Sequence, residues 1–164
     1  MYKRHLYLRI ADELYLKRLI IGGVDRVYEI GHNFRNEGIS TQHNPEFTLI
    51  EVYQAYADYA DIMRMVEELW STVAINVLGS AKVTYQGQEI DLTPPWKRIT
   101  MRDVILEACG VDIEAHQDLE ALWQAAQDRG LTVRQQPTWG RMVDELFSEY
   151  AEPRLIQPTF VTDY

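Results

Sequence analysis

The chain lacks the sequence features of membrane, secreted and disulfide-stabilised proteins. Its 164 residues include a single cysteine, Cys109, which cannot form an internal disulfide. No apolar run approaches the length of a membrane span, and the start of the chain shows no charged segment followed by an apolar stretch. With 46% hydrophobic residues, the composition is that of an ordinary globular protein. We therefore predict a cytoplasmic protein that has no membrane partner.

Positive charge is also scarce, which argues against nonspecific binding to nucleic acid. The chain has 16 Lys and Arg against 25 Asp and Glu, a formal net charge of -9. The charge is unevenly distributed, because residues 1–45 carry a net charge of about +2 and the negative net charge comes entirely from the residues after them. Any phosphate-binding surface is therefore expected near the start of the chain, and a randomly mixed surface is the alternative.

Hydrophobic periodicity and turn residues predict the elements of the first 60 residues. Asp12 is placed to cap a helix, and Gly22 and Gly23 are placed to end it. A polar stretch, GISTQHNP, separates two strand-like segments and predicts the loop of an antiparallel hairpin. The predicted elements are a strand at 5–10, a helix at 13–21, and strands at 26–37 and 46–57.

The rest of the chain is predicted to be mostly helical. Asp58 and Asp61 indicate the start of a helix that ends at Gly79, with an apolar stripe formed by Ile62, Met65, Val66, Leu69, Val73 and Val77. The segment VTYQGQEIDL predicts a small hairpin. From Thr100 the pattern predicts three helices, over TMRDVILEACG, DLEALWQAAQDRG and TWGRMVDELFSEYAEP, each with Gly or Pro near its end. The last residues, LIQPTFVTDY, predict a strand, and the lack of a later segment to complete a sheet suggests a truncated domain.

Alternation of side chains along the predicted hairpin gathers polar chemistry on its odd-numbered positions. Phe47, Glu51 and Tyr53 share one face of the second strand, and Arg35 and Glu37 join them if the odd faces of both strands coincide. A guanidinium binds phosphate or carboxylate, a ring stacks on a base, and a carboxylate beside a phenol suits an ammonium group. The alternative is the solvated outer face of an ordinary hairpin.

The opposite, even-numbered face of the first strand is mainly apolar or aromatic. It carries Tyr28, Ile30 and Phe34, with His32 among them. We therefore expect His32 to face a core.

The segment RVYEIGHNFRNEGISTQHNPEFTLIEVYQAYADY resembles motif 2 of class II aminoacyl-tRNA synthetases, with FRNEG and HNPEFT as its most specific parts. The preceding LYLRIADELYLKRLIIGGVDRVYEIG is similar to the lysyl branch, and the ending FVTDY also resembles the catalytic domain. The resemblance implies an α+β fold in which helices flank an antiparallel sheet. It divides the chain into the motif 2 part of a catalytic domain (1–79), a hairpin with an insertion-like helical segment (80–155) and the truncated start of a further core strand (156–164).

The resemblance also implies roles for particular residues. Arg35, the catalytic residue, would hold the α-phosphate of ATP and the carboxylate of lysine, while Phe47 stacks on adenine. The remaining implied contacts are Glu37, His43 and Asn44 with ATP or the tRNA end, Glu51 and Tyr53 with the ε-ammonium of lysine, and Glu13 with its α-amino group.

The implied reaction is attack of the lysine carboxylate on the α-phosphorus of ATP, followed by transfer of the lysyl group to tRNA(Lys). Positioning and charge neutralisation would supply most of the catalysis. The resemblance implies Mg²⁺ as a further requirement, with ligands outside this chain and no metal ligand within it. It also implies that the full-length protein is a homodimer.

The chain departs from the family pattern in what it omits. Motif 1, the glycine-rich motif 3 and the anticodon-binding barrel are absent from these 164 residues, so we expect the isolated chain to be inactive. Asp12 stands where the family more often has proline. Two alternatives remain open at this point: a stand-alone lysyl transferase that modifies a translation factor, and a non-catalytic synthetase-like binding fragment.

Overall fold

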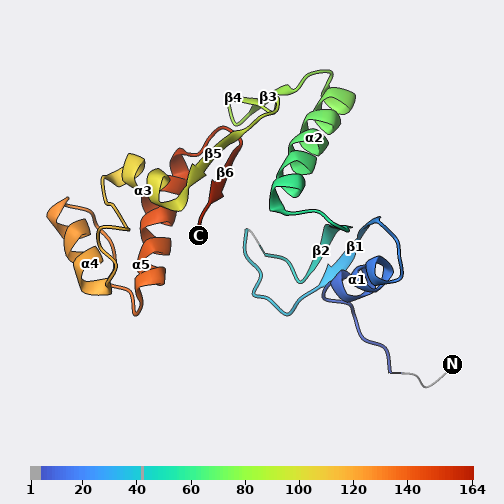
Figure 1. Cartoon of the computed structure of the whole chain (residues 1–164), viewed down its shortest axis with the longest axis horizontal. Coiled ribbons are helices and arrows are strands. Elements are labelled where there is room, and N and C mark those ends of the chain that lie inside the picture. The colour runs from blue at the N-terminus through green and yellow to red at the C-terminus, as the bar shows by residue number, and fades with distance from the viewer. Residues whose placement is uncertain (1–4, 42) are drawn as a thin grey trace. The chain divides into compact units, whose positions relative to one another are not determined.

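The computed structural model describes residues 5–41 and 43–164, and the chain divides into two compact units (Figure 1). The first unit ends at Tyr59 and the second comprises Ala60–Tyr164. Helices and short two-stranded sheets occur in both parts of the described chain, which gives an α+β protein as predicted. The domain boundaries that the sequence predicts, at 79/80 and 155/156, remain a prediction.

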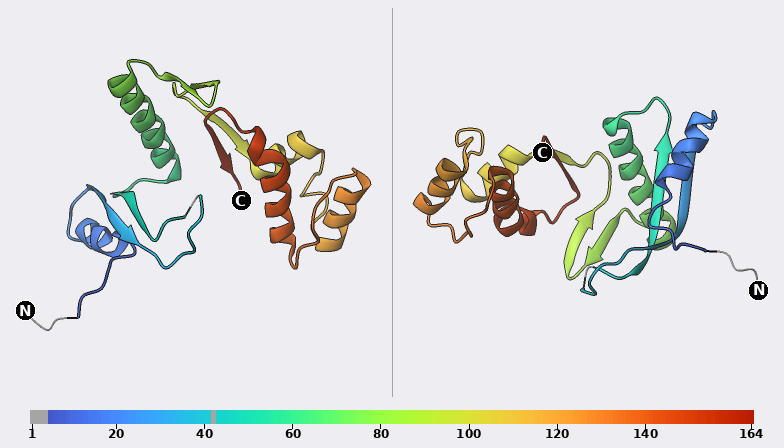
Figure 2. Two further views of the ribbon diagram at one scale, coloured as in Figure 1. Left: turned by 180° about the vertical axis from the view of Figure 1, so that it is seen from behind. Right: turned by 90° about the horizontal axis from the view of Figure 1, so that it is seen from below.

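The first unit is a helix packed on a β-hairpin (Figure 2). Its elements are α1 (Glu13–Ile21), β1 (Arg26–Phe34) and β2 (Glu46–Gln54). Gly22 and Gly23 follow α1, and Gly23 has a φ of 96°, which suits glycine. Both strands end three residues before their predicted ends. After β1 the chain leaves the ladder and enters the loop, and after β2 it turns at Tyr56, whose φ is 55°.

Two local predictions for this unit were wrong. No strand forms at residues 5–10, since among the described residues this segment makes one backbone bond, from the N–H of Phe34 to the carbonyl of Arg9, instead of a ladder. Asp12 precedes α1 but its side chain caps nothing. It is instead 1% exposed and paired with Arg9 at 2.7 Å.

The register of the hairpin places the odd positions of both strands on one face. Asn33 pairs with Phe47, and Glu29 pairs directly with Glu51. Residues at these positions are partly or fully buried, while the even positions of β1 before Phe34 are exposed. The expectation that His32 faces a core was therefore wrong, because α1 covers the odd face instead. His32 is exposed and bonds to Glu46, which is also exposed, at 2.7 Å.

The second unit begins with a long helix, α2 (Tyr59–Leu78), at the predicted place. Its predicted apolar stripe is not the buried face: Val77, for example, is 74% exposed, whereas Glu67 and Ala74 are buried. Glu67 is buried because it accepts a bond from the N–H of Trp96 and pairs with Arg98 at 2.6 Å. These bonds lower the pKa of Glu67.

Two small sheets follow α2. The predicted hairpin forms from β3 (Lys82–Tyr85) and β4 (Gln88–Asp91), with positive φ at both turn residues, Gln86 and Gly87. The strand predicted at the end of the chain is β6 (Thr159–Thr162). It pairs in parallel with β5 (Lys97–Thr100), a strand that the sequence pattern did not predict because its residues are mostly polar. The final strand therefore has a partner within the described chain, and the truncated domain remains a prediction.

Three helices form at the three predicted stretches and build the core of the second unit. They are α3 (Met101–Cys109), α4 (Leu119–Asp128) and α5 (Trp139–Leu146), which continues into the π-helix η1 (Phe147–Ala151) and the 3-10 helix η2 (Glu152–Arg154). Thr100, Asp118 and Thr138 cap the N-termini of α3, α4 and α5 through their side-chain oxygens. The fully buried side chains include Ile105, Leu122, Met142 and Leu146.

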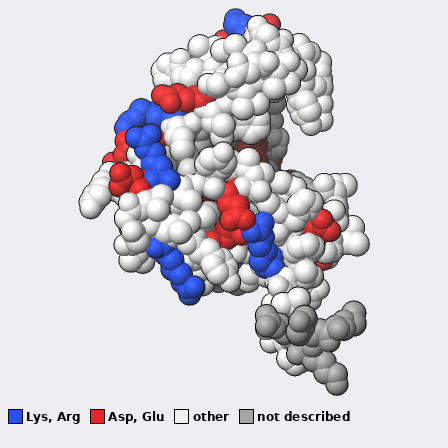
Figure 3. All heavy atoms as spheres, turned by 90° about the vertical axis from the view of Figure 1, so that its right-hand side faces the viewer, with Lys and Arg blue, Asp and Glu red and all other residues white. Residues whose placement is uncertain are grey.

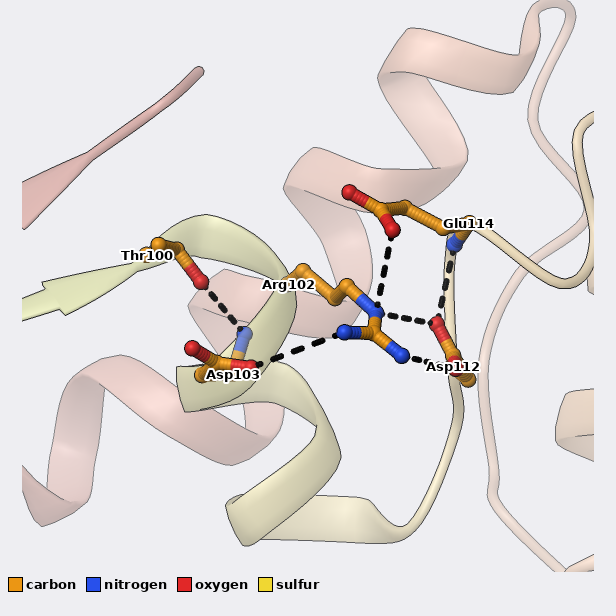
Figure 4. Close-up of polar contacts among 5 residues, drawn as sticks. All are labelled: Thr100, Arg102, Asp103, Asp112 and Glu114. Carbon is orange, nitrogen blue, oxygen red and sulfur yellow. Dashed lines mark hydrogen bonds and ion pairs between the residues drawn. The ribbon is translucent and has the colours of Figure 1, made fainter.

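An ion-pair network fixes the segment that follows α3 (Figure 4). Arg102 donates two bonds to Asp112, at 2.7 and 2.6 Å, and its Nε lies 3.4 Å from Glu114. Figure 4 shows both acids pointing at the guanidinium from the chain segment opposite α3. The bonds from Arg102 hold the pKa of Asp112 well below its usual range, so both partners stay charged.

Candidate functional site

A cavity of about 540 Å³ opens at the loop end of the β1–β2 hairpin. Its volume is within the range typical of small-molecule sites. All five residues predicted to contact ATP line this cavity, together with Ser40 and Thr41. The five are Arg35, Glu37, His43, Asn44 and Phe47.

Arg35 and Phe47 form a cation–aromatic pair at this cavity. The guanidinium carbon of Arg35 lies 5.2 Å from the centre of the Phe47 ring. The Nε of Arg35 donates to the carbonyl of Ile10 at 3.3 Å, and its backbone N–H donates to Pro45 at 3.0 Å. No carboxylate lies within ion-pair distance of Arg35 in residues 5–41 and 43–164, so its charge is left for an anion from outside the described chain.

The loop that lines the cavity is held by its own polar contacts. The backbone N–H of His43 donates to Oγ of Ser40, and the N–H of Ser40 donates to the carbonyl of His43, both at 3.0 Å. Nε2 of His43 also lies 3.8 Å from Glu37. The imidazole of His43 and the carboxylate of Glu37 therefore lie close together in the lining of the cavity.

The acidic end of the same face lies further along β2. The hydroxyl of Tyr53 donates to Oε2 of Glu51 at 3.1 Å. Burial, and then the bond to Glu51, raise the pKa of Tyr53 to about 12. The phenol therefore stays protonated at neutral pH and donates to the carboxylate of Glu51, whose other lone pairs can accept further bonds.

Glu13 lies at the start of α1, close to this acidic end but paired within its own helix. It accepts a bond from Lys17, and Nζ of Lys17 lies 5.8 Å from the centre of the Tyr53 ring. The structure thus brings Glu51 and Tyr53 into direct contact and places Glu13 nearby, with Lys17 as the present partner of Glu13.

The prediction from sequence missed a second group of polar residues on this face. Arg9 binds Glu29 and Asp12, and its Nε donates to the carbonyl of His32 at 2.9 Å. The signal that could have revealed this contact is Gly31, since a glycine inside a strand often marks the close approach of another group. A Cβ at Gly31 would lie only 1.8 Å from Nη2 of Arg9.

Asn33 is a further residue of this face without an assigned role. It is 0% exposed, and neither its side-chain oxygen nor its nitrogen has a hydrogen-bond partner among the described residues. One carboxylate oxygen of Asp12 is also without a partner there. Buried polar atoms of this kind mark places where water or a ligand atom completes a network.

Basic and acidic side chains are mixed on one face of the molecular surface. On the face that Figure 3 shows, Lys and Arg side chains lie beside Asp and Glu side chains. Among the described residues, no group of three or more His, Cys, Asp or Glu side chains is suitable to hold a metal ion. No helix in that part of the chain is long and apolar enough to cross a bilayer.

A family model described as tRNA synthetases class II (D, K and N) matches residues 1–164. The chain belongs to this family. Because the match covers both units, the hairpin that carries the cavity and the whole of the second unit both belong to the class II synthetase domain.

Three relatives place this class II chain more narrowly. It is 59% identical over 160 residues to a lysine–tRNA ligase from Thermosynechococcus vestitus, covering 97% of this chain and 32% of the relative. It is 55% identical over 161 residues to one from Chloroflexus aurantiacus, covering 98% of this chain and 33% of the relative. It is 56% identical over 162 residues to one from Roseiflexus castenholzii, covering 99% and 33%. The chain therefore spans about a third of the length of the curated relatives it matches.

Proposed function

We propose that this chain is part of a lysine–tRNA ligase, in which the β1–β2 face binds ATP and lysine side by side. One observation carries the proposal: Phe47 and Glu51 share one face of β2, and the guanidinium carbon of Arg35 lies 5.2 Å from the centre of the Phe47 ring. Relatives that bear the name lysine–tRNA ligase, at 55–59% identity over nearly the whole chain, support the choice of amino acid.

The cavity supplies the groups that ATP requires. In this proposal the adenine stacks on Phe47, and Arg35 binds the α-phosphate at the edge of the ring. Glu37, His43 and Asn44 contact the remaining parts of ATP or the 3′ end of tRNA(Lys). The cavity already groups these side chains, so little rearrangement is required when the nucleotide binds.

The acidic end of the face supplies the groups that lysine requires. Glu51 and the Tyr53 hydroxyl receive the ε-ammonium, and Glu13 receives the α-amino group after it exchanges its bond to Lys17. A neutral side chain in this position leaves the carboxylate of Glu51 without a partner, which is costly and so excludes uncharged amino acids.

The chemistry follows from these positions. An oxygen of the lysine carboxylate attacks the α-phosphorus of ATP, and the bond from that phosphorus to the bridging oxygen of pyrophosphate breaks. Arg35 binds both reacting groups and stabilises the negative charge that develops between them. A ribose hydroxyl of tRNA(Lys) then attacks the lysyl carbonyl and releases AMP.

The proposal extends to the whole protein. It includes a larger antiparallel sheet around β1 and β2, with residues 80–155 as an insertion-like segment. It also includes a homodimer in the cytoplasm, where a chain with one cysteine fits a reducing compartment. The family implies Mg²⁺, but no group of described residues fits the ion, and we assign no step to it.

The test is ATP–pyrophosphate exchange by the full gene product that contains these 164 residues. We expect exchange that depends on lysine, is absent with norleucine, and is followed by transfer of labelled lysine to tRNA(Lys). Absence of lysine-dependent exchange would overturn the proposal. Exchange without transfer to tRNA, but with transfer to a protein, would replace the tRNA acceptor with a protein acceptor.

A further inference from the structure

The face proposed to bind lysine has more acid than the substrate requires. Three carboxylates, those of Asp12, Glu13 and Glu51, act electrostatically on the Tyr53 phenol, and a fourth, that of Glu29, lies directly across the hairpin from Glu51. A lysine ammonium carries a single positive charge, so some of this negative charge must be neutralised by the protein. Among the described residues, Arg9 and Lys17 are the cations that contact these acids.

Glu29 is the acid that competes most directly with Glu51. The two residues are directly opposite each other in the antiparallel ladder, and their side chains lie on the same face. Side chains that face each other in this way have Cβ atoms about 5 Å apart, and like charges in such a pair are destabilising. An unpaired Glu29 would therefore repel Glu51 or bind the substrate ammonium in its place.

Arg9 removes that competition. It binds Glu29 and Asp12 through the same nitrogen, Nη1, while its Nε donates to the carbonyl of His32. This position exists because Gly31 has no side chain, since a Cβ there would collide with the Arg9 guanidinium. The bonds to the two acids raise the pKa of Arg9, and their charge keeps it cationic.

We propose that Arg9 is a positioning residue that determines which carboxylate receives the substrate ammonium: it neutralises Glu29 and leaves Glu51 free. The inference rests on the proposed function and extends it to the specificity of the amino-acid site. Arg9 contacts neither ATP nor lysine in this scheme. It acts through Glu29, and Gly31 is the residue that gives it room.

The test compares Arg9→Gln, Glu29→Gln and the double variant in the full gene product. Arg9→Gln removes the cation that binds Glu29 and Asp12, so an unneutralised Glu29 faces Glu51 and competes with it for the substrate ammonium. We expect kcat/KM for lysine at pH 7 to fall at least about tenfold, the size of one charge-assisted contact. KM for ATP should stay unchanged.

The double variant separates the charge effect from a structural one. It removes one positive and one negative charge together, so we expect it to recover kcat/KM for lysine to within about threefold of wild type. If Arg9 only holds the backbone of residues 9–12 against β1, the double variant will be as impaired as Arg9→Gln or more so. That result would overturn the inference.

Two further variants complete the design. Arg26→Gln makes the same charge change on the exposed face of β1, away from Glu29, and should leave all parameters unchanged. Gly31→Ala should reproduce the effect of Arg9→Gln, because the added methyl group displaces the guanidinium.

A double-mutant cycle in melting temperature provides a readout that does not depend on activity. Arg9→Gln should lower the melting temperature, and the loss should be smaller in the Glu29→Gln background, because Arg9 and Glu29 are bonded to each other. If this coupling is seen and the wild-type protein is inactive, only the proposed function fails. If the wild type is active and neither the coupling nor the recovery of kcat/KM is seen, only the role of Arg9 fails.

Discussion

Replacing Glu51 by glutamine removes one negative charge from the β1–β2 face while keeping the size of the side chain. The amide oxygen can still accept the bond that the Tyr53 hydroxyl now donates to Glu51 at 3.1 Å, so the local packing should survive. What is lost is the charge-assisted bond to the lysine ammonium. Such bonds contribute about 1.5–3 kcal/mol, which corresponds to a rise in KM for lysine of about 10- to 150-fold.

The binding of ATP should not change in this variant. Glu51 lies four positions after Phe47 on β2, which at about 3.3 Å per residue is roughly 13 Å along the strand. That distance exceeds the Debye length of about 8 Å at physiological ionic strength, so the cavity should not sense the lost charge. KM for ATP is therefore expected to stay within about twofold of wild type.

The assay is lysine-dependent pyrophosphate exchange at pH 7 with the full gene product, with lysine and ATP varied separately. Glu46→Gln is the matched control, because Glu46 is on the same strand but on the opposite face, where it bonds to His32. An unchanged KM for lysine in Glu51→Gln, or an equal rise in the Glu46→Gln control, would refute the assignment of Glu51 to the ammonium.

Three other outcomes follow from the structure. Phe47→Ala should raise KM for ATP by about 5- to 150-fold through loss of base stacking, with KM for lysine little changed, and equal changes in both would contradict the cavity assignment. Arg102→Ala should lower the melting temperature at pH 7. Arg102 lowers the pKa of Asp112 in the folded state, so this stabilisation is fully present above the ordinary carboxyl pKa of about 4. It declines as the pH falls below that value toward the lowered pKa. The calorimetric melting temperatures of variant and wild type should therefore converge as the pH is lowered from 4. The pKa of Tyr53 is raised to about 12, so its phenol should ionise at higher pH than an ordinary tyrosine in a titration followed at 295 nm. The stability that its bond to Glu51 contributes should be present below pH 10 and decline as the pH rises through 12. Tyr53→Phe should abolish both the ionisation near pH 12 and this loss of stability.

The elements that could be predicted from the sequence are those with strong local signals. Thr100, Asp118 and Thr138 precede apolar helical patterns, and each caps a helix at the predicted place. Gln86 and Gly87 predicted a tight turn between two short strands, and the hairpin forms there. In each case the information lies within a few residues of the element it specifies.

Predictions that depended on distant partners failed. The predicted apolar stripe of α2 is not its buried face. Glu67 is buried there, because Arg98 and the N–H of Trp96 satisfy its carboxylate. The polar strand β5 is a strand only because β6, about sixty residues later, pairs with it. Such pairs are set by packing, and the pattern of one segment does not reveal them.

The sequence alone determined the composition of the site. Strict alternation along β2 requires Phe47, Glu51 and Tyr53 to share one face, whatever the rest of the molecule does. The tertiary structure decided which face is covered and which charges are already paired. Arg9 reaches Glu29 across Gly31 because a segment without secondary structure lies beside β1, and no periodicity in that segment specifies this contact.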